Sequence, residues 1–141
     1  MSQSPEHLVR KWFDEIWNHR RLDAIDELMG EPCVIHDAGT YPGDIRRPAE
    51  FRALAEGLHH AISGIHVEIE DVVAHGEQVV IRCVVTGTHT GDGLGVPPSH
   101  RPVRITGMAW GRWREGKLVE AWNNFDLLSL FEQIGAIRRP S

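Results

Sequence analysis

The sequence predicts an α+β fold in which a curved, mainly antiparallel sheet closes on helices around one deep apolar pocket. Segments whose apolar residues have helical spacing come first in the chain. Four segments with the two-residue period of β-strands follow in succession, and a short helical segment ends the pattern. With 141 residues, the chain has the length of one domain, and we expect a single domain over residues 1–141.

The first half of the chain carries the signals of three helices and one short strand. Ser4 followed by Pro5 is a common helix start, and apolar residues with helical spacing come after it. Gly30 and Gly64 each follow a later stretch of helical spacing, which they are expected to end. These signals predict helices over residues 5–18, 22–29 and 48–63, and a strand over residues 33–36.

The second half has the pattern of a four-stranded meander. Gly76 and Gly116 mark two hairpin turns, and the β-branched stretch 79–90 predicts a strand covered on both faces. Asp126 is the predicted N-cap of the last helix, and Gly135 is the residue expected to end it. The predicted strands cover residues 66–75, 79–90, 103–114 and 118–125, and the last helix covers residues 127–134.

The composition limits which partners the protein is expected to bind and in which compartment it is expected to occur. The chain has 20 acidic and 15 basic residues, which gives no basic surface for a nucleic acid or an anionic membrane. No stretch is apolar for the ~18 residues that a membrane span needs, and no secretory leader precedes the first helix. Cys33 and Cys83 lie in apolar runs and are expected to be buried thiols. We therefore expect a cytoplasmic protein whose partner is an apolar small molecule.

Neither a metal nor a cofactor is expected from the motifs. Nine histidines are present, yet no HExxH motif occurs, and the neighbouring His59 and His60 diverge by about 100 degrees on a helix. The glycine-rich residues 91–95 lack the spacing and the lysine of a phosphate-binding loop. Five tryptophans exceed the need of an ordinary core, so Trp12 and others are expected to line a cavity or a subunit interface; core packing is the alternative.

Five segments resemble one known family. They read VRKWFDEIWN, VIHDAG, VVIRCVVTGTHTG, LGVPPSHRPVRITG and GKLVEAWNNFDLLSLFEQIG, and the similarity extends over residues 9–135. Together they resemble the SnoaL-like polyketide and ester cyclases of the nuclear transport factor 2-like superfamily. The resemblance implies a cone-shaped fold with one deep apolar pocket, and a homodimer or homotetramer formed through the outer face of the sheet.

The same resemblance implies an activity and site residues. The family's founding cyclases close a polyketide ring by an aldol condensation, with one aspartate as acid and base and with no cofactor. The matching position here is Asp126, and the family's other polar pocket position matches His36. Two further pocket positions that are polar in some cyclases match Gly107 and Ala109, which leaves the identity of the substrate open.

The two-residue period of the last strand predicts which side chains lie beside Asp126. Trp122, Asn124 and Asp126 share one face of that strand, so an aspartate pointing into the pocket would have an aromatic wall beside it. Such a wall desolvates a carboxylate and makes it a stronger base. The alternative is that Asp126 only caps the last helix. His36 likewise either contacts the substrate or is a satisfied core histidine.

Four further residues complete the predicted substrate-binding set. Arg82 and His89 have opposite parity on one strand, so one faces the pocket and the other does not. The loop over residues 91–101 has glycines in its first half and two prolines in its second, which favours a lid with Leu94 and Val96 on its inner side. An ordinary surface loop is the alternative.

Three functions remain open at this stage. The first is a cofactor-free cyclase or isomerase in which Asp126 moves a proton next to a carbonyl group. The second is an epoxide hydrolase on the same fold, with a relay of Asp126, Arg82 and Asp37. The third is a dimeric module that binds a small molecule without catalysis, since a fold does not determine a function.

Overall fold

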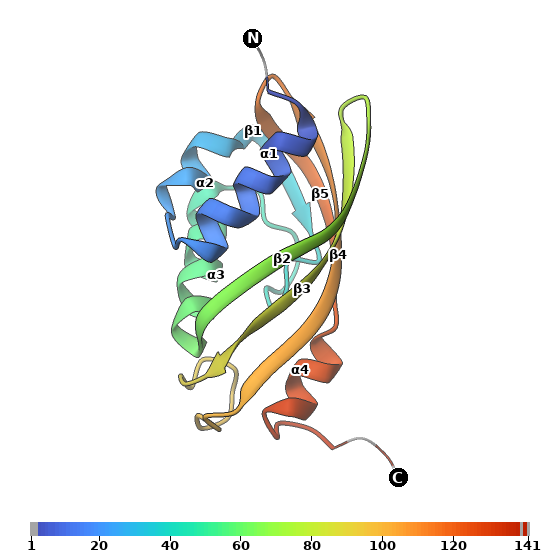
Figure 1. Ribbon diagram of the computed structural model, residues 1–141. Coiled ribbons are helices and arrows are strands. Elements are labelled where there is room, and N and C mark those ends of the chain that lie inside the picture. The colour runs from blue at the N-terminus through green and yellow to red at the C-terminus, as the bar shows by residue number, and fades with distance from the viewer. Residues whose placement is uncertain (1–2, 139, 141) are drawn as a thin grey trace.

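The computed structural model describes residues 3–138 and residue 140, and it confirms the α+β class. Five strands form one curved sheet in the order β1-β5-β4-β3-β2 (Figure 1). Strands β2 to β5 form the predicted antiparallel meander, and β1 pairs in parallel with β5. The elements are α1 (Pro5–Trp12), the π-helix η1 (Phe13–Asn18), α2 (Asp23–Leu28), β1 (Met29–His36), α3 (Pro48–Ala61), β2 (Ile62–His75), β3 (Gln78–His89), β4 (Pro102–Arg114), β5 (Lys117–Phe125) and α4 (Leu127–Gln133).

The helices divide the sheet into two unequal faces. Helices α1, α2 and α3 lie on one face, which we call the inner face, while the short α4 lies at one end of the sheet beside β4 (Figure 1). The opposite face, which we call the outer face, carries no helix of comparable size in the part of the chain shown. A side chain's position along a strand therefore decides whether it packs against the helices or points away from them on the outer face.

Most predicted helix ends are confirmed, but β1 and β2 both start earlier than predicted, and Gly30 lies inside β1. Ser4 caps α1 by accepting a hydrogen bond from the backbone N–H of His7, and Asp126 caps α4 in the same way from Ser129. The predicted third helix ends at Ala61, because Ile62 already has extended backbone angles. Gly64 lies inside β2 at a shift of register with a φ of +65°, so this glycine allows a bulge and does not end a helix.

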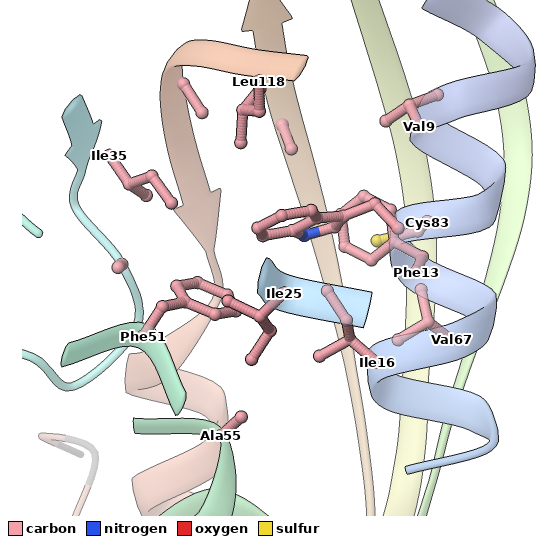
Figure 2. Close-up of a cluster of buried hydrophobic side chains, with 14 of the residues drawn as sticks. Val9, Phe13, Ile16, Ile25, Ile35, Phe51, Ala55, Val67, Cys83 and Leu118 are labelled. Carbon is pink, nitrogen blue, oxygen red and sulfur yellow. The ribbon is translucent and has the colours of Figure 1, made fainter. Parts of the chain in front are cut away.

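One apolar core joins the helices to the inner face. Figure 2 shows side chains from both layers pointing toward one another, with Ile16 and Ile25 on the helical side and Ile35 and Leu118 on the strand side. Ile16 and Ile25 are fully buried, and Ile35 is 1% exposed. Cys33 and Cys83 are buried and free, as predicted, and burial raises the pKa of the Cys83 thiol to about 11. The core thus lies between the helices and the inner face of the sheet.

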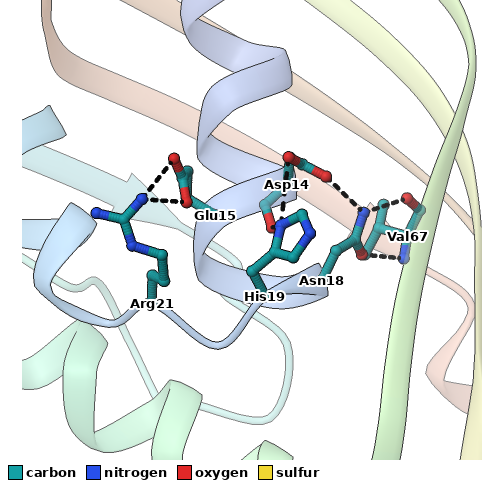
Figure 3. A network of polar contacts seen from close by, with 6 residues as sticks. All are labelled: Asp14, Glu15, Asn18, His19, Arg21 and Val67. Carbon is teal, nitrogen blue, oxygen red and sulfur yellow. Dashed lines mark hydrogen bonds and ion pairs between the residues drawn. The ribbon is translucent and has the colours of Figure 1, made fainter.

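An asparagine at the end of η1 attaches the helical layer to the edge of the sheet. Strand β2 is an edge strand, so part of its backbone has no neighbouring strand. The side chain of Asn18 donates to the carbonyl oxygen of Val67 at 3.0 Å and accepts from the N–H of Val67 at 2.6 Å (Figure 3). Asn18 thereby replaces one missing strand contact and holds the helix against β2.

Candidate functional site

An apolar cavity of about 160 Å³ lies between the inner face and the helices. Helices α1, η1 and α3 form one side of it, strands β2 to β5 form the other, and Phe125 and Leu127 line it where β5 leads into α4. The lining residues include no Asp, Glu, Lys, Arg or His; Thr40, Thr86 and Asn123 are the polar ones. A cavity of this size and composition fits a benzene-sized apolar molecule, since a dry cavity of about 150 Å³ holds benzene.

Aromatic rings form the helical wall of the cavity. Trp12 lies 5.0 Å from Phe51 and 6.2 Å from Trp113, measured between ring centroids, and Trp17 lies 6.0 Å from Phe51. All four residues line the cavity. The structure therefore places Trp12 where the sequence predicted it. These rings supply a rigid apolar surface with little conformational entropy to lose on binding.

Behind this wall, His59 on α3 contacts Trp17. The two ring centroids are 5.4 Å apart, and Nε2 of His59 donates to the carbonyl oxygen of Ile16 at 3.0 Å. Donation from Nε2 leaves Nδ1 as the unprotonated nitrogen of the neutral ring, and Nδ1 is buried with no partner among the residues placed by the structure. Burial lowers the pKa of His59, because a second proton would be desolvated there.

Asn123 is the carboxamide of the cavity wall. It lies on β5 opposite Ala109 of β4, and both residues line the cavity. Its Nδ2 donates to the backbone carbonyl oxygen of His36 at 3.0 Å. A carbonyl oxygen only accepts, so the amide group facing His36 is the NH2, and Oδ1 points elsewhere. Sequence reasoning missed Asn123 because it assigned the neighbouring Asn124 to the pocket.

The outer face carries a charged network around His36. Its Nε2 lies 2.9 Å from Glu120 and its Nδ1 lies 3.1 Å from Asp44. The ring stacks on Trp122 with centroids 5.3 Å apart, and Arg112 binds the other oxygen of Glu120 at 3.1 Å. The hydrogen bond to Glu120 is the largest cause that raises the pKa of His36. The side chain of His36 was predicted to be a polar group of the pocket. Two carboxylates instead hold it outside the cavity.

The three residues predicted to share a face of β5 do share it, but it is the outer one. Trp122 stacks on His36, and Asn124 pairs with the exposed Met108. Asp126 is exposed, and its Oδ1 accepts from the N–H of Ser129 at 3.0 Å. The expected aromatic wall and desolvation of Asp126 are therefore not found. The reason is parity, since Ala121, Asn123 and Phe125 occupy the inner positions of the same strand.

The structure also separates Arg82 from His89. Arg82 is on the outer face and binds Glu70 at 2.6 Å and Asp71 at 2.5 Å. With its guanidinium bound by these carboxylates and Asp126 acting as a helix cap, the relay expected for an epoxide hydrolase is not assembled. Arg82 and Asp126 instead line an open groove on the outer face.

His89 is fully buried on the inner side but lies outside the cavity lining. Its Nδ1 accepts from the N–H of Ser99 at 3.0 Å, so it holds the base of the loop over residues 90–101. Leu94 and Val96 pack partly buried against the core, and neither lines the cavity. In this conformation the loop does not cover the ligand space in the way that the lid prediction requires.

Of the two small residues predicted in the pocket, one lines it. Ala109 is part of the cavity wall. Gly107 also faces inward, but a Cβ built on it would lie 2.2 Å from the ring of Phe125. Gly107 is therefore needed to make room for Phe125. The hairpin register pairs Gly107 with Phe125, so an inward-facing Gly107 places Phe125, and with it Asn123, on the inner face.

No three His, Cys, Asp or Glu side chains among the described residues are grouped to hold a metal ion. Asp44 and Glu120 bind opposite nitrogens of His36, so these three do not converge on one point. The described helices include none that is both long and apolar enough to cross a bilayer.

Comparisons with known proteins agree with this architecture. A family model described as SnoaL-like polyketide cyclase matches residues 7–134. IdmH from Streptomyces antibioticus, provisionally described as a polyketide cyclase, is 27% identical with a TM-score of 0.79, and the match covers 94% of this chain and 99% of that chain. No curated protein gives a significant match.

Two other solved structures show the same fold at lower identity. One is a protein from Jannaschia sp. CCS1, provisionally described as a SnoaL-like polyketide cyclase; it is 24% identical with a TM-score of 0.83 over 97% of this chain and 95% of that chain. The other is AclR from Streptomyces galilaeus, provisionally described as a hydroxylase; it is 23% identical with a TM-score of 0.82 over 97% of this chain and 84% of that chain.

Proposed function

Because this chain belongs to the SnoaL-like polyketide cyclase family, we propose that it cyclises or isomerises an apolar, carbonyl-containing metabolite such as a polyketide ester, without a cofactor. The observation that carries the proposal is the apolar cavity between the helices and the inner face. Its lining has no charged side chain, so a charged ligand would lose its hydration there without compensation. A neutral molecule that is mostly hydrocarbon gains from the same burial.

In the proposed reaction, Asp126 takes a proton from the carbon next to one carbonyl group. The resulting enolate carbon attacks a second carbonyl carbon, a carbon–carbon bond forms, and the new alkoxide takes the proton back from Asp126. Phe125 and Leu127, on either side of Asp126, both line the cavity, so the backbone of Asp126 lies next to the cavity lining. To act on a bound ligand, the side chain has to leave its cap on Ser129 and turn toward the cavity.

We assign His36 a positioning role in this reaction. Its side chain is engaged by Asp44 and Glu120 on the outer face, while its backbone carbonyl oxygen orients the side chain of Asn123 on the inner face. A residue that acts through another in this way affects binding geometry and does not transfer the proton itself.

A non-catalytic ligand-binding module is the second candidate. The observation that favours it is that the cavity lining contains no acid or base, while Asp126 is engaged as a helix cap. In this case the chain would bind the same neutral, apolar class of ligand and leave it unchanged. The two candidates differ in one property, which is turnover.

Replacing Asp126 by Asn separates the two candidates. Asparagine still caps a helix but cannot accept the proton, so the cyclase proposal predicts a fall in turnover of about a hundredfold or more with nearly unchanged stability. Turnover of linear 1,5-diketones such as heptane-2,6-dione is followed by 1H NMR, from the loss of the diketone signals and the appearance of the cyclic β-hydroxyketone. Binding of these diketones without turnover by the wild type would support the binding module.

We also propose a homodimer in a reducing, cytoplasmic compartment. Met108 and Trp110 are 50% and 47% exposed on the outer face, and a large apolar patch there is unfavourable in water. Cys33 and Cys83 are free thiols, which suits a reducing compartment. Light scattering should give about twice the chain mass of 15.9 kDa, and a monomer mass at micromolar concentration would contradict the dimer.

A further inference from the structure

Asn123 has a free hydrogen-bond acceptor in an otherwise apolar cavity wall. Its Nδ2 is engaged by the carbonyl oxygen of His36, which fixes the plane of the carboxamide. No donor within the described residues reaches Oδ1, although this atom belongs to a residue that lines the cavity. Oδ1 has no partner among these residues and is not fully buried, so it remains accessible. The acceptor is thus oriented before any ligand arrives.

The rest of the wall offers no competing acceptor of the same kind. Thr40 and Thr86 are the other polar residues of the lining; their hydroxyl groups rotate freely, whereas the carboxamide of Asn123 is fixed by its hydrogen bond to His36. The indole nitrogen of Trp113 is a donor and not an acceptor, and it is fully buried beside Gly111, where a Cβ would lie 3.0 Å from it. A ligand's polar group therefore finds one fixed, accessible acceptor on β5.

We infer that Asn123 determines the specificity of the cavity by accepting a hydrogen bond from a hydroxyl group of the ligand. The ligand class is a neutral, ring-sized and otherwise apolar molecule that carries an alcohol, phenol or enol. The inference rests on the proposed use of the cavity as the ligand site. A carboxylate is excluded twice, because it has no hydrogen to donate to Oδ1 and because it would be buried among apolar side chains.

This specificity suits the proposed chemistry. The enol form of a dicarbonyl compound carries a hydroxyl hydrogen, and an aldol ring closure creates a new hydroxyl group from a carbonyl oxygen. Oδ1 of Asn123 accepts from either of these groups but offers nothing to an isolated carbonyl oxygen, which is itself an acceptor. The site is therefore complementary to the enol and to the cyclised product more than to a simple diketone.

A pair of ligands of nearly equal size tests the inference. Phenol and toluene differ in one hydroxyl group against one methyl group, and benzoate adds the charge. Titrations followed by 15N–1H NMR give the three dissociation constants for the wild type, for Asn123→Leu and for Asn124→Leu. Asn124 is the matched control, because it is the same residue type one position along β5 and is exposed on the outer face.

The wild type should bind phenol about three- to tenfold more tightly than toluene, which is the effect of one net hydrogen bond, and benzoate should not bind. Asn123→Leu should abolish the preference while keeping toluene binding, which shows that the cavity is still intact. The preference should persist in Asn124→Leu. Equal affinity of the wild type for phenol and toluene, or loss of the preference in Asn124→Leu alone, would overturn the inference and leave the proposed ligand site in place. If neither phenol nor toluene bound, the proposed ligand site itself would be wrong.

Discussion

The two faces of β4 and β5 have opposite chemistry. The inner positions, such as Ala109 and Asn123, border an uncharged cavity, whereas the outer positions carry the ion pair of Arg112 with Glu120 and the exposed ring of Trp110. Successive residues of one strand alternate between these environments. The difference separates two roles: the inner face is suited to hold a neutral ligand, and the outer face, with charged groups beside exposed apolar ones, is not.

A histidine also lies on each side of the sheet, His36 on the outer face of β1 and His59 on α3 at the helical side, and the two environments move their pKa values in opposite directions. On the outer side, the carboxylates of Glu120 and Asp44 stabilise the charged form of His36 and raise its pKa. On the helical side of the cavity, burial disfavours the charged form of His59 and lowers its pKa. The same side-chain type therefore reports which of the two environments surrounds it.

The largest expected contrast between the faces is in stability. Ile81 is fully buried on the inner face of β3, so Ile81→Ala should lower the free energy of unfolding by about 2 to 5 kcal/mol. Val73, which is 69% exposed on β2, should lose no more than about 0.5 kcal/mol when replaced by Ala. Urea unfolding of both variants at a fixed protein concentration measures the difference. Equal losses would contradict the division into a packed and an open face.

A smaller effect is expected at Gly107. A Cβ at this position overlaps the ring of Phe125, so Gly107→Ala should push the ring into the cavity and destabilise the fold by about 1 to 3 kcal/mol. Toluene binding should weaken in parallel, because Phe125 lines the cavity. The matched control is Gly57→Ala on α3, where a Cβ meets nothing within 4 Å and alanine favours the helix. Thermal unfolding and NMR titration would show whether Gly107 tolerates alanine as Gly57 does.

The smallest expected effects are the pH dependences of the two histidines. A raised pKa means that His36 contributes its stability below the unfolded pKa and loses it as the pH rises through the folded pKa. A lowered pKa means that His59 contributes above the unfolded pKa and loses its contribution as the pH falls toward the folded value. His36→Gln should therefore cost more at about pH 5.5 than at about pH 9, and His59→Gln the reverse, each by less than about 1 kcal/mol.

Denaturation at these two pH values measures both slopes. The comparison uses two substitutions of the same type, so effects of the substitution itself largely cancel. Slopes of the same sign for both variants would show that the carboxylates around His36 do not stabilise its charged form, or that burial does not penalise that of His59.

The pattern of the sequence was sufficient for the order of the elements and for most of their ends. Local signals explain this success, since Ser4 and Asp126 cap helices and Gly116 forms a hairpin turn, each within a few residues. The parallel pairing of β1 with β5 joins segments about 85 residues apart and has no local signal. The family resemblance was confirmed by the match over residues 7–134.

The candidate site was predicted only in part, for a physical reason. Alternation shows which residues share a face of a strand, but it does not show which face is covered by helices. On β5 both faces carry an aromatic ring and an asparagine, with Trp122 and Asn124 on one and Asn123 and Phe125 on the other. Only the tertiary packing of α1 and α3 against one face distinguishes them, and this selects Asn123.

The central claim is that the inner cavity, and not the charged outer face, is the ligand site. A crystal structure with bound 4-bromophenol tests it most directly, because anomalous scattering locates the bromine without ambiguity. We predict the bromine inside the cavity and the phenol oxygen within hydrogen-bond distance of Oδ1 of Asn123. Bromine in the outer groove beside Arg82 and Asp126, with an empty cavity, would contradict the account.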